Sequence, residues 1–69
     1  MSDRQIERGI REYLKARNIG GLTVWDIRAE NGVASVRGRA ESIFAKRACW
    51  ECCRHVTGVR AVIDLVDLA

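Results

Sequence analysis

The 69-residue sequence lacks any long apolar run, so no segment is predicted to span a membrane. It also shows no secretory leader, because residues 1–5 lead directly into a charged amphipathic stretch, whereas a signal peptide needs an apolar middle region. As written, the chain is therefore expected in the cytoplasm, or in the periplasm or at a membrane if it was excised from a longer exported protein. This length predicts a single domain, residues 1–69, with a thin core and little volume for a deep cleft.

Common catalytic and nucleotide-binding motifs are also missing. The six glycines form neither a P-loop nor a dinucleotide fingerprint, and there is no Gly-x-x-Gly loop of the kind that KH nucleic-acid modules use. His55 is the only histidine, and no serine or lone carboxylate is placed to form a triad with it. We therefore predict no catalytic residues, no enzyme activity and no cofactor.

The three cysteines lie within one short segment. An odd number of clustered cysteines suits a reducing compartment better than a disulfide framework. On a helix, Cys49, Cys52 and Cys53 share one face while His55 points away, so metal ligands do not converge. We predict that at least Cys49 and Cys52 are buried, reduced and unligated, and that the chain has no metal site. A thiol- or metal-responsive role is the alternative.

Residues 3–17 are predicted to form a first helix. Ser2 and Gln5 fit a capping box at its start, and Asn18 is expected to end it in the left-handed conformation. Apolar residues recur at helical spacing on one side, and the opposite side is basic. This basic stripe consists of Arg4, Arg8, Arg11 and Lys15, with Glu7 and Glu12 beside it.

Residues 22–30 and 33–40 are predicted to form a β-hairpin. The turn Asn31-Gly32 is a strong signal for a two-residue connection, which fixes the register of the two strands. One face of the hairpin is apolar. It pairs Ala29 with Ala34, Ile27 with Val36, and Trp25 with Gly38, whose missing side chain is expected to leave room for the indole across the sheet. The other face should meet water and carries Asp26, Arg28, Ser35, Arg37 and Arg39.

The remaining residues predict a second helix and a last strand. Ser42 is expected to cap the helix, which runs to about Val56, and Gly58 is expected to stop it before a strand at residues 59–68. The order α-β-β-α-β predicts an α+β fold with two helices packed on one face of a three-stranded sheet, the last strand lying parallel beside the second. The inner stripe of the second helix is expected to be Ala45, Ala48, Cys49, Cys52 and Val56.

Two stretches resemble a known family. They are NGVASVRGRAES at residues 31–42 and VTGVRAVID at residues 56–64, which are similar to the BON domain, named for bacterial osmotically inducible and nodulation proteins. The first helix and the order of elements fit the same family, so the resemblance covers nearly the whole chain. It implies a module without catalytic residues that attaches proteins to membranes through phospholipid contact.

Two surfaces are candidates for binding. The net charge is +3, and ten of the twelve basic residues are Arg, which suits contacts with phosphate and carboxylate groups. The first candidate is the outer side of the second helix, because an exposed Trp beside Arg is typical of interfaces and of lipid headgroup regions. Its residues are Ile43, Arg47, Trp50 and Arg54. The second candidate is the basic stripe.

We expect the partner to be an anionic phospholipid surface or a protein, a second copy of this chain included. Nucleic acid bound through the basic stripe and the Arg-bearing face of the sheet is the alternative.

Overall fold

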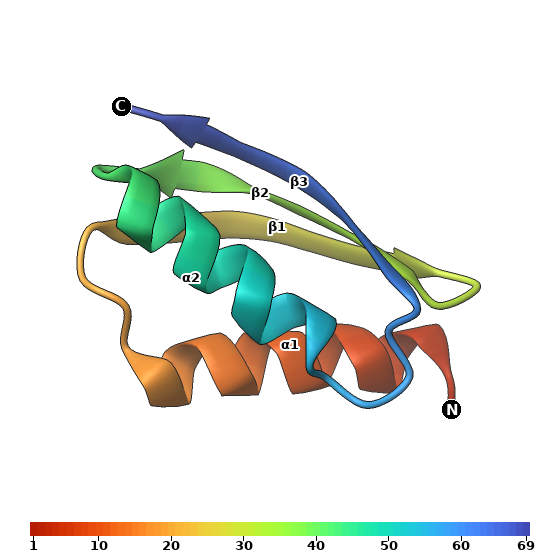
Figure 1. Ribbon diagram of the computed structural model, residues 1–69. Coiled ribbons are helices and arrows are strands. Elements are labelled where there is room, and N and C mark those ends of the chain that lie inside the picture. The colour runs from red at the N-terminus through yellow and green to blue at the C-terminus, as the bar shows by residue number, and fades with distance from the viewer.

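A computed structural model describes residues 1–69 and shows two helices and a three-stranded sheet in the predicted order (Figure 1). The elements are α1 (Asp3–Arg17), β1 (Leu22–Glu30), β2 (Val33–Ala40), α2 (Ile43–Arg54) and β3 (Ala61–Leu68). The strands are ordered β1-β2-β3, with β1 antiparallel and β3 parallel to β2. Both helices cover the same face of the sheet and leave the other face bare (Figure 1). The predicted α+β fold and the position of the last strand are confirmed.

Local hydrogen bonds explain where α1 begins and ends. The Ser2 hydroxyl accepts a hydrogen bond from the Gln5 N–H at 3.2 Å, and the Gln5 side-chain oxygen accepts one from the Ser2 N–H at 2.9 Å. This is the predicted capping box, which satisfies N–H groups that have no partner within the helix. Asn18 ends the helix with a φ of 48°, as expected.

The second helix is slightly shorter than predicted. Ser42 caps it by accepting a hydrogen bond from the Ala45 N–H at 3.1 Å, but α2 ends at Arg54 with His55 as its C-cap. Gly58, with a φ of 94°, lies in the loop that follows and does not stop the helix directly. A side chain at Gly58 would also press against Ile6, so this glycine serves the packing of the loop on α1.

The hairpin has the predicted turn but not the predicted register throughout. Ala29 pairs with Ala34 and Ile27 with Val36, as expected, but a β-bulge between Val24 and Asp26 places Val24 opposite Gly38. The prediction that Trp25 lies opposite Gly38 on the apolar face is therefore wrong. Glycine at position 38 permits this register, because a Cβ atom there would collide with the Thr23 carbonyl oxygen.

The core lies between the sheet and the two helices. From α1 it receives the large side chains Ile6 and Ile10, whereas α2 contributes only small ones. The buried residues of α2 are Ala45, Cys49, Cys52 and Cys53. Small side chains let a helix approach a sheet closely, so this composition fits the position of α2 under β2 and β3.

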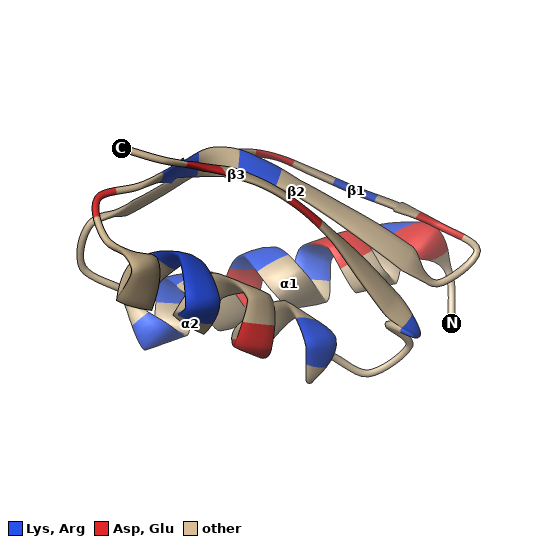
Figure 2. Cartoon of the chain, turned by 45° about the horizontal axis from the view of Figure 1, so that its top comes forward, with Lys and Arg blue, Asp and Glu red and all other residues tan.

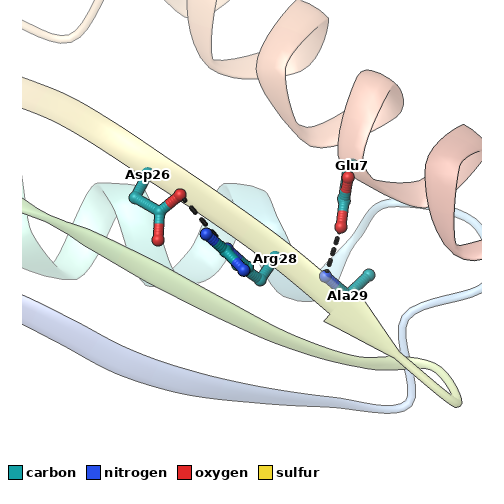
Figure 3. A network of polar contacts seen from close by, with 4 residues as sticks. All are labelled: Glu7, Asp26, Arg28 and Ala29. Carbon is teal, nitrogen blue, oxygen red and sulfur yellow. Dashed lines mark hydrogen bonds and ion pairs between the residues drawn. The ribbon is translucent and has the colours of Figure 1, made fainter.

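Charged side chains from the helices cover part of each open edge of the sheet. At the β1 edge, the Ala29 N–H donates a hydrogen bond to Glu7 Oε2 of α1 at 2.8 Å (Figure 3). At the β3 edge, Lys46 of α2 donates to the Val66 carbonyl, and the Val66 N–H donates to Asp64 Oδ1 at 3.0 Å. Unpaired groups at a sheet edge are a template for another strand, so these contacts oppose edge-to-edge association.

Candidate functional site

The outward face of α2 carries large apolar side chains in water. Ile43 is 56% exposed, Phe44 81% and Trp50 37%. These residues lie opposite the buried Ala45, Cys49 and Cys52 on the helix, so packing of the core turns them outward. We call this surface the α2 face and define it by Ile43, Phe44, Arg47, Trp50 and Arg54. It contains all four residues that the sequence analysis proposed as binding candidates on the second helix.

Phe44 is the member that sequence reasoning missed. It follows Ile43 directly and is the most exposed large apolar residue of the chain. At about 100° per residue, position 44 lies outside the stripe that contains Ala45 and Cys49. The same helical spacing that identified the core stripe would have placed Phe44 in solvent.

Ion pairs and stacking organise the far end of the α2 face. The Arg54 guanidinium lies over the Trp50 ring, 5.1 Å from its centroid. Glu51 Oε2 is 3.8 Å from Arg54 and 3.5 Å from His55 Nε2. Because the guanidinium covers part of the indole, Trp50 and Arg54 together form one aromatic and cationic surface.

A shallow hollow separates the α2 face from β3. It has a volume of about 310 Å³ and is lined by Ile43, Lys46, Arg47, Trp50 and Asp64. Lys46 Nζ lies 3.1 Å from Asp64 Oδ2, so this cation has a partner inside the protein. Arg47 has no ion-pair partner and is exposed. Its guanidinium is therefore available to an anion from outside.

The basic stripe of α1 is exposed along its whole length. Its members Arg4, Arg8, Arg11 and Lys15 take part in no ion pair. Glu7, which lies beside the stripe, accepts a hydrogen bond from the Ala29 N–H of β1. The last turns of α1 and the first turns of α2 bring Lys and Arg to the same end of the molecule (Figure 2). That end also holds Ile43 and Phe44, where α2 begins.

The cysteine cluster belongs to the core. The burial predicted for Cys49 and Cys52 is confirmed, Cys53 is buried as well, and all three are free thiols at most 6% exposed. A hydrogen bond between Cys49 and Cys53 lowers the pKa of Cys49 and, together with burial, raises the pKa of Cys53. Burial raises the pKa of Cys52. No group of three or more His, Cys, Asp or Glu side chains is arranged to hold a metal ion.

Comparisons with known proteins leave the family of this chain open. No family model matches the sequence, and no curated protein matches it either. The resemblance to the BON domain therefore stays a prediction. Neither α1, with 15 residues, nor α2, with 12, is long and apolar enough to cross a bilayer.

Proposed function

We propose that this chain is a non-enzymatic binding module that attaches to an anionic phospholipid surface through its α2 face. The observation that carries the proposal is the pair Ile43 and Phe44, 56% and 81% exposed at the first turn of α2. Moving such side chains out of water lowers the free energy by about 25 cal/mol per Å² of buried apolar area. A membrane interface offers an apolar layer for them within reach of a headgroup layer for the neighbouring cations.

The charges beside this pair favour an anionic surface over an uncharged apolar one. Arg47 lies one turn after Ile43 and has no partner inside the protein, and Arg54 stacks on Trp50 two turns further. Each cation close to an anionic bilayer contributes on the order of 1 kcal/mol, which salt reduces. Two cations and two or three partly inserted apolar side chains give weak, reversible attachment.

The resemblance to the BON domain supports the same partner, since phospholipid contact is what that family implies. The proposal nevertheless rests on exposed residues that the resemblance does not supply. Phe44 lies outside both matching stretches, and so do Arg47 and Trp50. The α2 face can therefore be tested without assuming the family.

Sedimentation with lipid vesicles tests the proposal. We expect the chain to co-sediment with vesicles of phosphatidylglycerol and phosphatidylcholine and to remain in solution with phosphatidylcholine alone. The double variant Ile43→Ser/Phe44→Ser should bind at least about ten-fold more weakly, because it removes the apolar contribution. This loss should persist at high salt, whereas the loss caused by Arg47→Ala/Arg54→Ala should be largest at low salt.

A matched control comes from the bare face of the sheet. Ile63 and Leu65 are 48% and 38% exposed on β3, and Ile63→Ser/Leu65→Ser also removes two exposed apolar side chains, but away from α2. This variant should bind vesicles like the unaltered chain. Equal losses from both double variants, or full binding by Ile43→Ser/Phe44→Ser, would refute the α2 face as the lipid contact. Self-association that depends on Ile43 and Phe44 without vesicle binding would point to a second copy as the partner instead.

A further inference from the structure

The bulge in β1 places Trp25 in an unusual position. A bulge disrupts strand pairing locally and redirects a side chain, and here it removes an indole from the apolar face of the sheet. Trp25 is 61% exposed, although the chain has a thin core and only two tryptophans. The sequence predicts that this indole lies across the apolar face of the sheet, but the structure exposes it to solvent on the edge strand β1.

Trp25 lines a groove between the last turns of α1 and the first half of β1. The groove has a volume of about 310 Å³, which is near the lower end of the range for ligand sites. Apolar residues line much of it, among them Leu14, Val24 and Ile27. Its polar lining includes Arg11, Lys15 and Asn18. The groove can hold one planar ring system beside the indole, with the cations Arg11 and Lys15 close to that ring.

The charge of the groove favours an anion. Arg11 and Lys15 are exposed and have no ion-pair partner. The single carboxylate in the lining, Asp26, already faces the Arg28 guanidinium at 3.5 Å (Figure 3). The two cations also continue the basic stripe, since Arg8 and Arg4 follow on the same side of α1 at steps of about 4.5 to 6 Å. A row of positive charge therefore leads away from the groove along the helix.

We infer that the Trp25 groove binds single-stranded nucleic acid. One base stacks on the indole of Trp25, and the successive phosphates beside it contact Lys15, Arg11, Arg8 and Arg4 in turn. Aromatic stacking combined with a track of cations is how proteins bind single strands without reading their sequence. A duplex hides the faces of its bases, so the groove selects against it. This surface lies on α1 and β1 and is independent of the α2 face.

Fluorescence titration tests the inference with Trp25 as its own reporter. In a Trp50→Phe background, a twelve-residue oligo-dT should quench Trp25 as a base stacks on it. Trp25→Ala, followed by fluorescence anisotropy of a labelled oligonucleotide, should lower affinity at least about ten-fold, and Trp25→Phe should restore most of it, because stacking needs an aromatic face. Arg11→Ala/Lys15→Ala should reduce the slope of log affinity against log salt by about 1.4, or about 0.7 for each lost phosphate contact on a single strand.

Matched controls separate stacking from general attraction of charge. Arg47→Ala/Arg54→Ala removes the same charge from the α2 face and should leave the salt slope for oligo-dT unchanged. Heparin is an anion without bases, so Trp25→Ala should not weaken its binding. Circular dichroism and thermal melting of each variant should match those of the parent chain. Oligo-dT binding that Trp25→Ala leaves unchanged, or no quenching of Trp25 at 50 mM salt, overturns the inference, and so does an equal loss of heparin binding.

Discussion

The two helices and the strands beside them divide the molecule into an α1–β1 half and an α2–β3 half that differ in where their large apolar side chains lie. The α1–β1 half buries Ile6 and Ile10 and keeps the outer side of α1 basic. The α2–β3 half buries alanine and cysteine from α2 and Val66 from β3, and it exposes six of the nine large apolar residues that face solvent. These six are Ile43, Phe44, Trp50, Ile63, Leu65 and Leu68. Arg is more frequent in the α1–β1 half, with five residues, than in the α2–β3 half, with two.

The difference shows how one thin core can support two kinds of surface. Small side chains on the inner side of α2 are enough to pack this helix against the sheet. The larger residues of α2 therefore remain available for contacts outside the protein. In α1 the large residues are needed inside, so its outer side offers charge with little apolar area. We therefore assign stability mainly to the α1–β1 half, and the attachment that we propose to the α2 face of the other half.

The largest expected effect concerns the core contribution of each half. Ile10 and Cys53 are both fully buried. Ile10→Ala should cost about 2–5 kcal/mol in the free energy of unfolding, through lost burial and the cavity left behind. Cys53→Ala should cost about 1 kcal/mol, because it removes a single heavy atom. Urea denaturation measures both values, with Ile10→Val as the milder substitution if Ile10→Ala does not fold. If Cys53→Ala lowered the free energy of unfolding more than Ile10→Ala, the assignment of stability to the α1–β1 half would be wrong.

A smaller effect is expected at the edges of the sheet. Lys46→Met keeps the aliphatic chain but leaves Asp64 and the Val66 carbonyl without their cation, and we expect a cost of roughly 1–2 kcal/mol. The freed β3 edge should also pair with other chains, so association should rise with concentration in sedimentation velocity. Glu7→Gln keeps an acceptor for the Ala29 N–H and should cost less. Arg47→Met, at an exposed cation without a partner, is the control and should stay within about 0.5 kcal/mol. A strictly monomeric Lys46→Met chain of unchanged stability would show that Lys46 does not protect the β3 edge.

The buried cysteines of α2 predict that the stability of the chain depends on pH. The hydrogen bond with Cys49, together with burial, raises the pKa of Cys53 above its ordinary value of 9.0. Above pH 9.0 the unfolded chain therefore loses a proton that the folded chain keeps, and stability falls as pH rises. The slope is about 1.4 kcal/mol per pH unit for one proton. Burial also raises the pKa of Cys52, which adds to the fall in this window, whereas the lowered pKa of Cys49 acts below pH 9.0. In urea unfolding between pH 9 and 10.5, the free energy of unfolding should fall less steeply with pH for Cys53→Ala than for the parent chain. Equal slopes would contradict a raised pKa of Cys53.

Most of the fold could be predicted because its signals are local in the sequence. The capping box at Ser2, the left-handed Asn18 and the Asn31-Gly32 turn each act within a few residues, and the structure shows all three. Alternating apolar residues then place the sheet faces correctly from Ile27 to Val36.

The features that sequence reasoning missed depend on contacts between distant segments. The bulge at Trp25 accompanies a close approach of the Thr23 carbonyl to Gly38, and no local pattern reports that distance. The edge contacts of Glu7 and Lys46 join residues about twenty positions apart. Phe44 is different, because its exposure follows from helical spacing alone and was within reach of the sequence. Of the five residues that define the α2 face, the sequence analysis named Ile43, Arg47, Trp50 and Arg54 and omitted Phe44.

The most direct test of the α2–β3 half as the membrane-attached one uses the two tryptophans as reporters. Trp50 lies on the α2 face and Trp25 on β1, so Trp25→Phe and Trp50→Phe each leave one reporter in one half of the molecule. With vesicles of phosphatidylglycerol and phosphatidylcholine, the Trp50 emission should shift to shorter wavelength and be quenched by lipids brominated along their acyl chains. The Trp25 emission should stay unchanged. A shift of Trp25 without one of Trp50, or no shift of either when the vesicles are in excess, would contradict attachment through α2.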